Sequence, residues 1–431
     1  MEKIKEEHNI KKKKDVDIEW IYNIPFSWEL KRVKNLFYIS KQKAHIQNPV
    51  VLSLARSGVK VRDISNNEGQ LAESYEEYNP VIPGDLLLNP MDLYSGANCS
   101  MSEVSGVISP AYINLRAIDN NVNSKFYDYY FKVQYWSMAM FAHGKGVSYD
   151  NRWTINRETI LNYYLPYISF DKQNDIVKLL NDKLLKISKM IEIEEQQIEK
   201  LKEYKQSLIT EAVTKGLDKN AEMKDSGVEW IGKIPKDWQV IKLKYIATSN
   251  DESIAESDID DRVIKYVDIG SVSLENGVEH IEEIKLKDAP SRARRITKEG
   301  DLIVSTVRTY LKAIATINEP NIIVSTGFCV IRNKSAINNK YLEYACKSDF
   351  FTNMVSSQSI GVNYPSISSY QLMNLCIVVP EIKAQETMIV FLNNKISKIE
   401  KMINTKKEKI EKLNEYKKSL IYEYVTGKKE V

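Results

Sequence analysis

Two twelve-residue stretches, one in each half of the chain, decide the fold. The stretch IEKLKEYKQSLI at residues 198–209 returns as IEKLNEYKKSLI at residues 410–421. The copies lie 212 residues apart in a chain of 431, so each half ends in the same segment. This match predicts that the chain consists of two copies of one unit of about 210 residues.

The duplication continues outward from these stretches. EWIYNIPFSW at residues 19–28 returns as EWIGKIPKDW at residues 229–238, and Gly84-Asp85-Leu86 returns as Gly300-Asp301-Leu302. The order of the matches is kept while the offset drifts only between 210 and 216 residues. Chance is therefore a poor explanation for the repeat, although the repeat alone says nothing about chemistry.

Each half ends in a segment that predicts a long helix. More than about 40 residues without Gly or Pro follow Pro166 and again Pro380. Apolar residues recur in both segments at alternating spacings of four and three, which is typical of a coiled coil. One repeated step of three, from Leu201 to Tyr204 and again before Tyr416, predicts a stammer in the coil.

The predicted coiled-coil seam has the same positions in both helices. Its members are Leu180, Leu184, Ile187, Ile191, Glu194, Ile198, Leu201 and Leu208, matched by Leu392, Ile396, Ile399, Ile403, Lys406, Ile410, Leu413 and Leu420. If the helices pair antiparallel about a pseudo-two-fold axis, Glu194 faces Lys406 at the midpoint. We hypothesise that this charge pair sets the register, because a mismatched pairing would bury like charges.

The remainder of each half has short apolar runs broken by turn-forming residues, which indicates a mixed domain of strands and some helix. The fold class is α+β, with two repeated mixed α/β domains joined by two long helices in an antiparallel coiled coil. The predicted boundaries are 1–14 for a basic polar tail, 15–172 for the first domain, 173–216 for the first helix, 217–225 for a linker, 226–384 for the second domain and 385–427 for the second helix.

Composition restricts the class of protein. The 61 basic and 58 acidic residues leave a net charge of +3, so any nucleic-acid binding must use local patches. The four cysteines, Cys99, Cys329, Cys346 and Cys376, form no close pair, which favours a reducing cytoplasm over a disulfide framework. We expect a cytoplasmic protein without a signal peptide or membrane span.

Enzyme signatures are absent from the sequence. Neither a phosphate-binding loop, nor a dinucleotide-binding fingerprint, nor the Asn-Pro-Pro-aromatic box of amino-methyltransferases occurs, and the four histidines lack metal-ligand spacing. Asp268 with Glu283-Ile284-Lys285 has the residue types of a metal-dependent nuclease, but Glu-x-Lys recurs by chance in a chain so rich in both residues. We expect no catalytic residue, metal or cofactor in this chain.

Basic residues interleaved with hydroxyl and aromatic residues form the candidate nucleic-acid contacts. Cations and hydroxyls suit phosphates, and arginine suits bidentate contact with guanine. The candidates are Arg56, Lys60, Arg62, Tyr94, Lys145, Tyr149 and Arg152 in the first half, and Arg292, Arg294, Arg295, Arg308, Tyr310, Lys312, Asn363 and Tyr364 in the second. For each residue taken alone, a solvated surface position remains the alternative.

Several of these motifs together resemble a known family. SGVEWIGKIP at 226–235, GDLIVSTVR at 300–308, and the helix from Pro380 through 410–421 resemble a target-recognition domain and spacer helix of the specificity subunit of type I restriction-modification systems. The resemblance occurs once in each half, and the two copies together cover nearly the whole chain.

The resemblance implies a DNA-binding function. Each domain would read one half of a bipartite asymmetric site in double-stranded DNA. The coiled coil would set the spacing and dock two methyltransferase subunits. Those partners would bind S-adenosylmethionine, while restriction subunits would use ATP and cleave DNA, so this subunit itself would not be catalytic.

Two other classes stay open from the sequence. One is a coiled-coil scaffold whose two domains bind protein, and the other, disfavoured by the missing cofactor motifs, is a self-contained DNA-modifying enzyme. The bases recognised and the gap between the half-sites cannot be derived from the residues.

Overall fold

The computed structural model describes residues 13–18, 20–46, 48–55, 57–65, 72, 74–91, 93, 99–146, 153–258, 260–334 and 337–431. The chain divides into two compact units. The first comprises Met1–Ile193 with Glu408–Val431, and the second comprises Glu194–Lys407. The first unit therefore combines two segments that are distant in the sequence, whereas the second is continuous.

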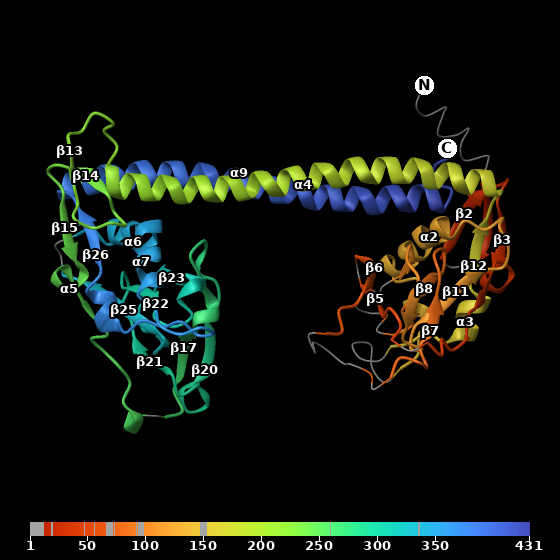
Figure 1. Ribbon diagram of the computed structural model, residues 1–431, viewed down its shortest axis with the longest axis horizontal. Helices are drawn as coiled ribbons and strands as arrows, with labels where there is room; N and C mark the ends of the chain where they lie inside the picture. The colour runs from red at the N-terminus through yellow and green to blue at the C-terminus, as the bar shows by residue number, and fades with distance from the viewer. Residues whose placement is uncertain are drawn as a thin grey trace. The chain divides into compact units, whose positions relative to one another are not determined.

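Two long helices contribute a segment to each unit. Helix α4 covers Phe170–Lys215 and α9 covers Ile382–Val425, so each begins three residues before its predicted start. Within each unit the segments of α4 and α9 lie side by side (Figure 1).

The order of the contacts between α4 and α9 shows the relative direction of the two helices. In the first unit, Lys183 Nζ donates to Tyr424 Oη at 3.4 Å and Lys417 Nζ donates to Ser188 Oγ at 3.2 Å. In the second unit, Lys205 Nζ lies 3.5 Å from Glu400 Oε1. Partner numbers fall along α9 as they rise along α4, so the helices pair antiparallel in both units.

The predicted charge pair of the seam lies inside the second unit. Lys406 Nζ donates to Glu194 Oε2 at 3.0 Å and also to Gln197 Oε1. The Glu194 side chain is 9% exposed and that of Lys406 is 21% exposed. Glu194 and Lys406 thus occupy the same layer of the coil.

The predicted stammer is wrong. Tyr204 and Tyr416 are each 53% exposed, whereas the neighbouring Lys205 side chain is only 12% exposed and Lys417 is half-buried. The seam therefore continues from Leu201 through Lys205, and spacings of four and three alternate without interruption. A lysine can occupy a seam position because its aliphatic stem packs while its ammonium reaches a polar partner.

The first unit is built on a four-stranded antiparallel sheet with the strand order β4-β11-β8-β9. Its strands are β4 (Phe37–Ile39), β11 (Ile113–Ala117), β8 (Leu86–Leu88) and β9 (Cys99–Met101). Around it lie the strand pairs β1 (Lys13–Ile18) with β2 (Ile21–Pro25), β3 (Glu29–Arg32) with β12 (Tyr164–Tyr167), β5 (Leu52–Ala55) with β6 (Gly58–Val61), and β7 (Asn79–Val81) with β10 (Gly106–Ile108). Helices α2 (Ser124–Trp136) and α3 (Arg157–Asn162) complete the unit.

The second unit contains the equivalent sheet, with the order β16-β25-β22-β23. Its strands are β16 (Ala247–Ser249), β25 (Phe328–Asn333), β22 (Leu302–Ser305) and β23 (Ile314–Thr316). A further sheet with the order β20-β17-β24-β21 comprises β20 (Glu282–Lys285), β17 (Val263–Val267), β24 (Ile322–Ser325) and β21 (Ala293–Ile296), of which only β17 and β24 pair in parallel. The strand pairs are β13 (Met223–Asp225) with β14 (Lys233–Pro235), β15 (Gln239–Lys242) with β26 (Cys376–Val379), and β18 (Val272–Ser273) with β19 (Gly277–Val278), and the helices include α6 (Asn339–Lys347), α7 (Asp349–Ser357) and α8 (Ser369–Met373).

The repeated Gly-Asp-Leu motif is structural. Asp301 accepts a hydrogen bond from the backbone N–H of Lys298 at 2.8 Å. It also forms an ion pair with Arg332, whose Nη2 lies 2.8 Å away. Asp85 makes the same ion pair with Arg116 at 2.7 Å in the first unit. Each carboxylate joins a turn to the next strand of the sheet, which explains why both residues recur in the two halves.

The repeated tryptophan block receives the end of a long helix in each unit. A Cβ added at Gly216, just after α4, would lie 3.1 Å from the Trp238 ring. One added at Gly427, just after α9, would clash with Pro25 and lie 3.2 Å from the Trp28 ring. Glycine at these positions lets the chain turn against the block, and both glycines have positive φ.

Candidate nucleic-acid interface

A strained turn follows β22 in the second unit. Arg308 and Lys312 have φ of 50° and 49°, and they flank a short 3-10 turn over Thr309–Leu311. The left-handed conformation costs a residue with a side chain about 1–2 kcal/mol, so two such residues close together need support from their surroundings. The buried Thr309 between them provides it, because its hydroxyl bonds to Ser359 Oγ at 2.8 Å.

The loop after α7 forms the second half of this surface. Ile360 and Ser366 pair as an antiparallel bridge through hydrogen bonds of 2.9 and 3.0 Å. Gly361, at φ +119°, allows the turn between them, because a Cβ there would lie 3.0 Å from the Tyr364 carbonyl oxygen. Ile367 N also donates to Thr306 O at 2.9 Å. We call residues 306–312 and 359–366 together the loop-pair surface.

The loop-pair surface combines cations with exposed aromatic and polar groups. The Arg308 guanidinium lies 5.1 Å from the centre of the Tyr364 ring, a cation–π contact. Tyr310 and Tyr364 are 58% and 66% exposed, and Asn363 is exposed. The sequence has no Asp or Glu from residue 302 to 318 or from 350 to 380. Such a surface suits a polyanion, because cations and hydrogen-bonding groups lie together without competing carboxylates.

The three arginines around β21 differ from one another in the structure. Arg292 is exposed and forms a bidentate ion pair with Asp268 at 2.9 and 3.2 Å, and the hydrogen bond with this carboxylate raises the Arg292 pKa. Arg294 and Arg295 are half-buried, and Arg295 Nε is buried without a hydrogen-bond partner. Of the three, Arg292 has the most accessible guanidinium, and a ligand phosphate there would compete with Asp268.

Backbone hydrogen bonds place Arg292 beside the loop-pair surface. Thr326 N donates to Arg292 O at 2.8 Å, and Thr306 N donates to the carbonyl of the next residue, Gly327, at 2.7 Å. Arg292, Arg308 and Lys312 therefore lie around one connected set of turns.

Candidates in the first unit are only partly described. Arg56, Tyr94, Tyr149 and Arg152 lie outside the described residues. Lys60 is exposed on β6, Arg62 is half-buried just after it, and Lys145 is exposed and pairs through its backbone with Thr154 at 2.7 and 3.0 Å. The equivalent surface of this unit therefore rests on fewer described residues.

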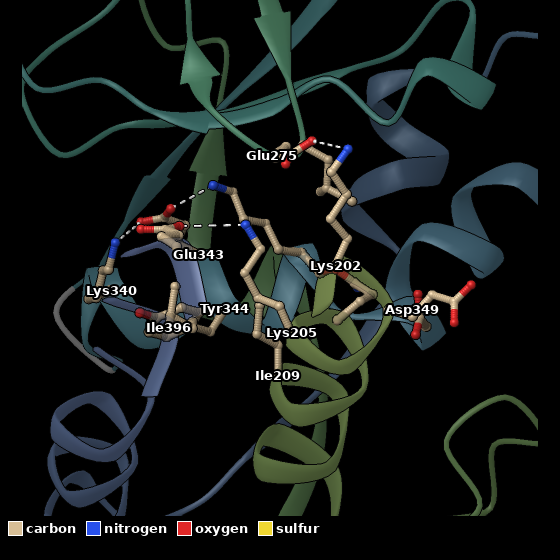
Figure 2. A pocket seen from close by; sticks show the side chains of 14 residues that line it. Lys202, Lys205, Ile209, Glu275, Lys340, Glu343, Tyr344, Asp349 and Ile396 are labelled. Carbon is tan, nitrogen blue, oxygen red and sulfur yellow. Dashed lines mark hydrogen bonds and ion pairs between the residues drawn. The ribbon is translucent and has the colours of Figure 1, made fainter. Parts of the chain in front are cut away.

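A cavity of about 550 Å³ lies between the helices and the rest of the second unit. Charged residues from both sides line it, and Figure 2 shows the ion pairs among them. Lys202 of α4 lies 3.4 Å from Glu275 in the β18–β19 turn, and Glu343 of α6 accepts from Lys340 and Lys347 at 2.9 and 2.8 Å. Burial raises the Glu343 pKa, but attraction to Lys347 and Lys340 outweighs it and holds this pKa below 4.5. The Glu343 pairs lie within α6, whereas the Lys202–Glu275 pair connects α4 to the domain, so we assign that pair a positioning role.

The described residues carry neither a metal cluster nor a membrane span. No group of three or more His, Cys, Asp and Glu is placed to hold a metal in the described part of the chain. Asp268 of the nuclease-like pattern is instead engaged by Arg292. No helix among these residues has the length and apolarity to cross a bilayer.

Three exposed apolar residues of the loop-pair surface escaped sequence reasoning. Leu311, Ile360 and Val362 are 43%, 75% and 98% exposed. A search for basic residues does not find them. The sequence signal for Ile360 and Val362 is the lack of any charged side chain from residue 350 to 380.

Comparison with known proteins finds a family domain in the second half of the chain. Residues 235–412 match the type I restriction modification DNA specificity domain. The chain is also 23% identical over 364 residues to the type I restriction enzyme MjaVIII specificity subunit of Methanocaldococcus jannaschii, which covers 80% of this chain and 81% of that protein. Residues 235–412 thus match a DNA specificity domain family, and most of the chain is similar to a type I specificity subunit. Members of this family recognise DNA sequences and are generally not catalytic themselves.

Solved structures show that the specificity-subunit fold extends over nearly all of the chain. A chain from a structure that addresses complex assembly and conformational transition of a type I system has a TM-score of 0.67 at 13% identity, covering 94% of this chain and 99% of that one. The HsdS subunit from Thermoanaerobacter tengcongensis has a TM-score of 0.51 at 12% identity, covering 94% and 98%. Because the loop-pair surface lies within residues 235–412, which match a DNA specificity domain, it is a candidate DNA-contacting surface.

Proposed function

We propose that this specificity subunit reads a bipartite asymmetric DNA site. The first recognition domain, residues 15–172, would read one half, and the second, residues 226–384, would read the other. The two spacer helices would hold the halves at a set spacing and dock two methyltransferase subunits. Restriction subunits would join these in the full complex.

The single observation that carries this proposal is a shared scaffold with different connecting segments. The sheets β4-β11-β8-β9 and β16-β25-β22-β23 correspond strand by strand, each with its Asp–Arg ion pair. The strand pairs β6-β5 and β10-β7 of the first unit, joined by the parallel bridge between Val51 and Val107, correspond to the sheet β20-β17-β24-β21 of the second. The connecting segments differ, since two residues link β5 to β6, whereas residues 268–281, which include β18 and β19, link β17 to β20. Equivalent scaffolds with different loops suit two different half-sites.

The helix lengths suit the repeat of DNA. The seam from Leu180 to Leu208 spans roughly 42 Å at about 1.5 Å per residue. Successive major grooves on one face of the duplex are about 34–36 Å apart. Helices of this length can therefore hold two domains near successive grooves.

Exposed residues beside the seam supply a docking surface for methyltransferase subunits. Met190 and Tyr204 of α4 each directly precede a seam residue, and their repeat equivalents Met402 and Tyr416 of α9 do the same. Their exposures are 44%, 53%, 51% and 53%. Each unit therefore carries one exposed Met and one exposed Tyr on the same flank of the coil.

The opposite flank of the coil faces the second recognition domain. The cavity residues Lys202 and Ile209 each directly follow a seam residue. Positions before and after the seam lie on opposite flanks of a helix. The Met and Tyr side chains are thus directed away from the domain, which leaves their flank available to a partner.

The reactions themselves belong to the partners in this proposal. Methyltransferase subunits would bind S-adenosylmethionine and take the target adenine out of the base stack, and restriction subunits would use ATP. The specificity subunit would provide position and sequence recognition only.

A domain exchange tests the function. Residues 15–172 are replaced by the first domain of another specificity subunit, the chain is co-expressed with its methyltransferase subunits, and the methylated motif is determined. We expect one half of the motif to change and the other half and the association with methyltransferase to persist. An unchanged motif, or no association with methyltransferase, would overturn the proposal.

A second test concerns the cations of the second domain. Arg308→Ala with Lys312→Ala should weaken DNA binding and reduce its salt dependence, because phosphate contacts release counterions. Replacing an arginine that contacts a base should instead cost about 1–3 kcal/mol and relax one position of the motif. If Arg292, Arg294, Arg295 and Arg308 are all neutralised and affinity and salt slope stay the same, these DNA contacts are wrong.

A further inference from the structure

The most exposed aliphatic residue of the loop-pair surface is Val362. It is 98% exposed, and Ile360 on the same loop is 75% exposed. Exposed apolar side chains occur singly on any surface, but these two lie beside the exposed Tyr310 and Tyr364 and the half-exposed Leu311. Together they form an apolar patch on a small surface.

The loop that carries Val362 is held in a defined conformation. The Ile360–Ser366 bridge closes it, Gly361 turns it at positive φ, and the Thr309–Ser359 hydrogen bond ties it to the strained turn. These hydrogen bonds and the glycine turn hold the loop in a conformation that leaves Ile360 and Val362 exposed. The exposure of Val362 is therefore a property of the fold.

The surroundings of the patch indicate its partner. Arg308 and Lys312 flank it, and the two segments that form it lack carboxylates. This positive charge suits a polyanion, and DNA is favoured because the loop-pair surface lies within residues 235–412, which match a DNA specificity domain. An apolar contact in the major groove has one target that identifies a base, the C5-methyl group of thymine.

We propose that Val362, supported by Ile360, contacts a thymine methyl group in the half-site read by the second recognition domain. This inference rests on the proposed function and adds a specificity-determining contact to it. Arg308 and Lys312 would hold the phosphates on either side, and the cross-loop hydrogen bonds would keep the valine at a constant depth in the groove.

Removal of the methyl group from the DNA tests the contact without altering the protein. The full chain is assembled with its methyltransferase subunits, and the methylated motif is determined. Each thymine of the second half-site is then replaced in turn by deoxyuridine, which lacks only the methyl group. Affinity is measured for the wild-type chain, Val362→Ala, Ile360→Ala and the control Val263→Ala, whose valine is 62% exposed on β17.

The wild-type complex should lose about fourfold in affinity at one thymine, the effect of burying one methyl group. Val362→Ala should lose a similar factor on thymine DNA and should no longer distinguish thymine from uracil at that position. Val263→Ala should behave as the wild type. Removing the valine and removing the thymine methyl group should therefore each cost the same contact, so the two losses of affinity should not add.

Two results would overturn the inference. In one, Val362→Ala and Ile360→Ala both keep the wild-type preference for thymine at every position. In the other, Val362→Ala weakens binding to all DNA alike, as expected for a side chain wedged between base steps. Failure of the proposed function is seen separately, since the wild-type complex would then methylate no specific motif.

Discussion

The ion pair at the centre of the coil gives a quantitative prediction. Lys406→Met removes the ammonium that lies 3.0 Å from Glu194 Oε2 but keeps the aliphatic length. A hydrogen bond with charged partners contributes about 1.5–3 kcal/mol. Because Lys406 is 21% exposed, solvent screens part of this attraction, and we expect a loss of about 2 kcal/mol.

The double variant distinguishes a specific pair from general seam packing. Glu194→Leu with Lys406→Leu continues the apolar seam, and replacing a buried pair by packed apolar residues is often neutral or stabilising. The coupling between the two positions should therefore be about 2 kcal/mol, and Glu194→Lys with Lys406→Glu should recover much of the stability.

Hydrogen exchange of the full chain, followed by mass spectrometry, measures this coupling locally. Peptides that cover both helices around the pair should exchange about 30-fold faster in Lys406→Met, since 1.4 kcal/mol corresponds to tenfold. Lys401→Met, at an exposed position of the same helix, is the matched control and should exchange like the wild type. The cycle is completed by Glu194→Leu alone and Lys406→Leu alone. If their two losses of stability add up to that of the double variant within about 0.5 kcal/mol, the pair does not act as a unit and the reasoning fails.

Three further predictions follow from other contacts. Asp301→Asn keeps an acceptor for Lys298 N but loses the ion pair with Arg332, so it should destabilise the second unit by about 1–3 kcal/mol, and Asp85→Asn should do the same in the first; hydrogen exchange confined to the other unit would contradict this. The lowered Glu343 pKa stabilises the fold above pH 4.5, and this contribution should disappear as the pH falls further; melting curves of Lys347→Met should show a smaller loss on acidification, and an identical pH dependence would count against the assignment. Burial raises the pKa of every cysteine thiol, that of Cys329 to about 11, yet Cys376 is only half-buried; alkylation of the native protein should label Cys376 first, and earlier labelling of Cys346 would be inconsistent with the packing.

The candidate site was predictable only for one kind of residue. Arg308, Tyr310, Lys312 and Tyr364 stand out in the sequence as cations and aromatics among turn-forming residues, and the structure brings them into one surface. Val362 does not stand out, because its exposure depends on hydrogen bonds between loops about 50 residues apart.

The coil shows why a seam is only partly legible from the residues. Tyr204 at a spacing of three and Lys205 at a spacing of four are both compatible with a helical stripe. Apolar character favours the tyrosine, but the partner helix supplies Glu400 for the lysine ammonium. Which of the two is buried is thus decided by a residue almost 200 positions away.

The sequence by itself determined the duplication, the two long helices and the absence of familiar catalytic motifs, because repeats, helical periodicity and motifs are properties of neighbouring residues. Tertiary structure alone decided that Glu408–Val431 complete the first unit and that Asp301 and Arg332 form a structural pair. It also decided that Val362, in a loop without charged residues, is exposed to solvent. These features depend on contacts between distant segments, whose energies no local pattern encodes.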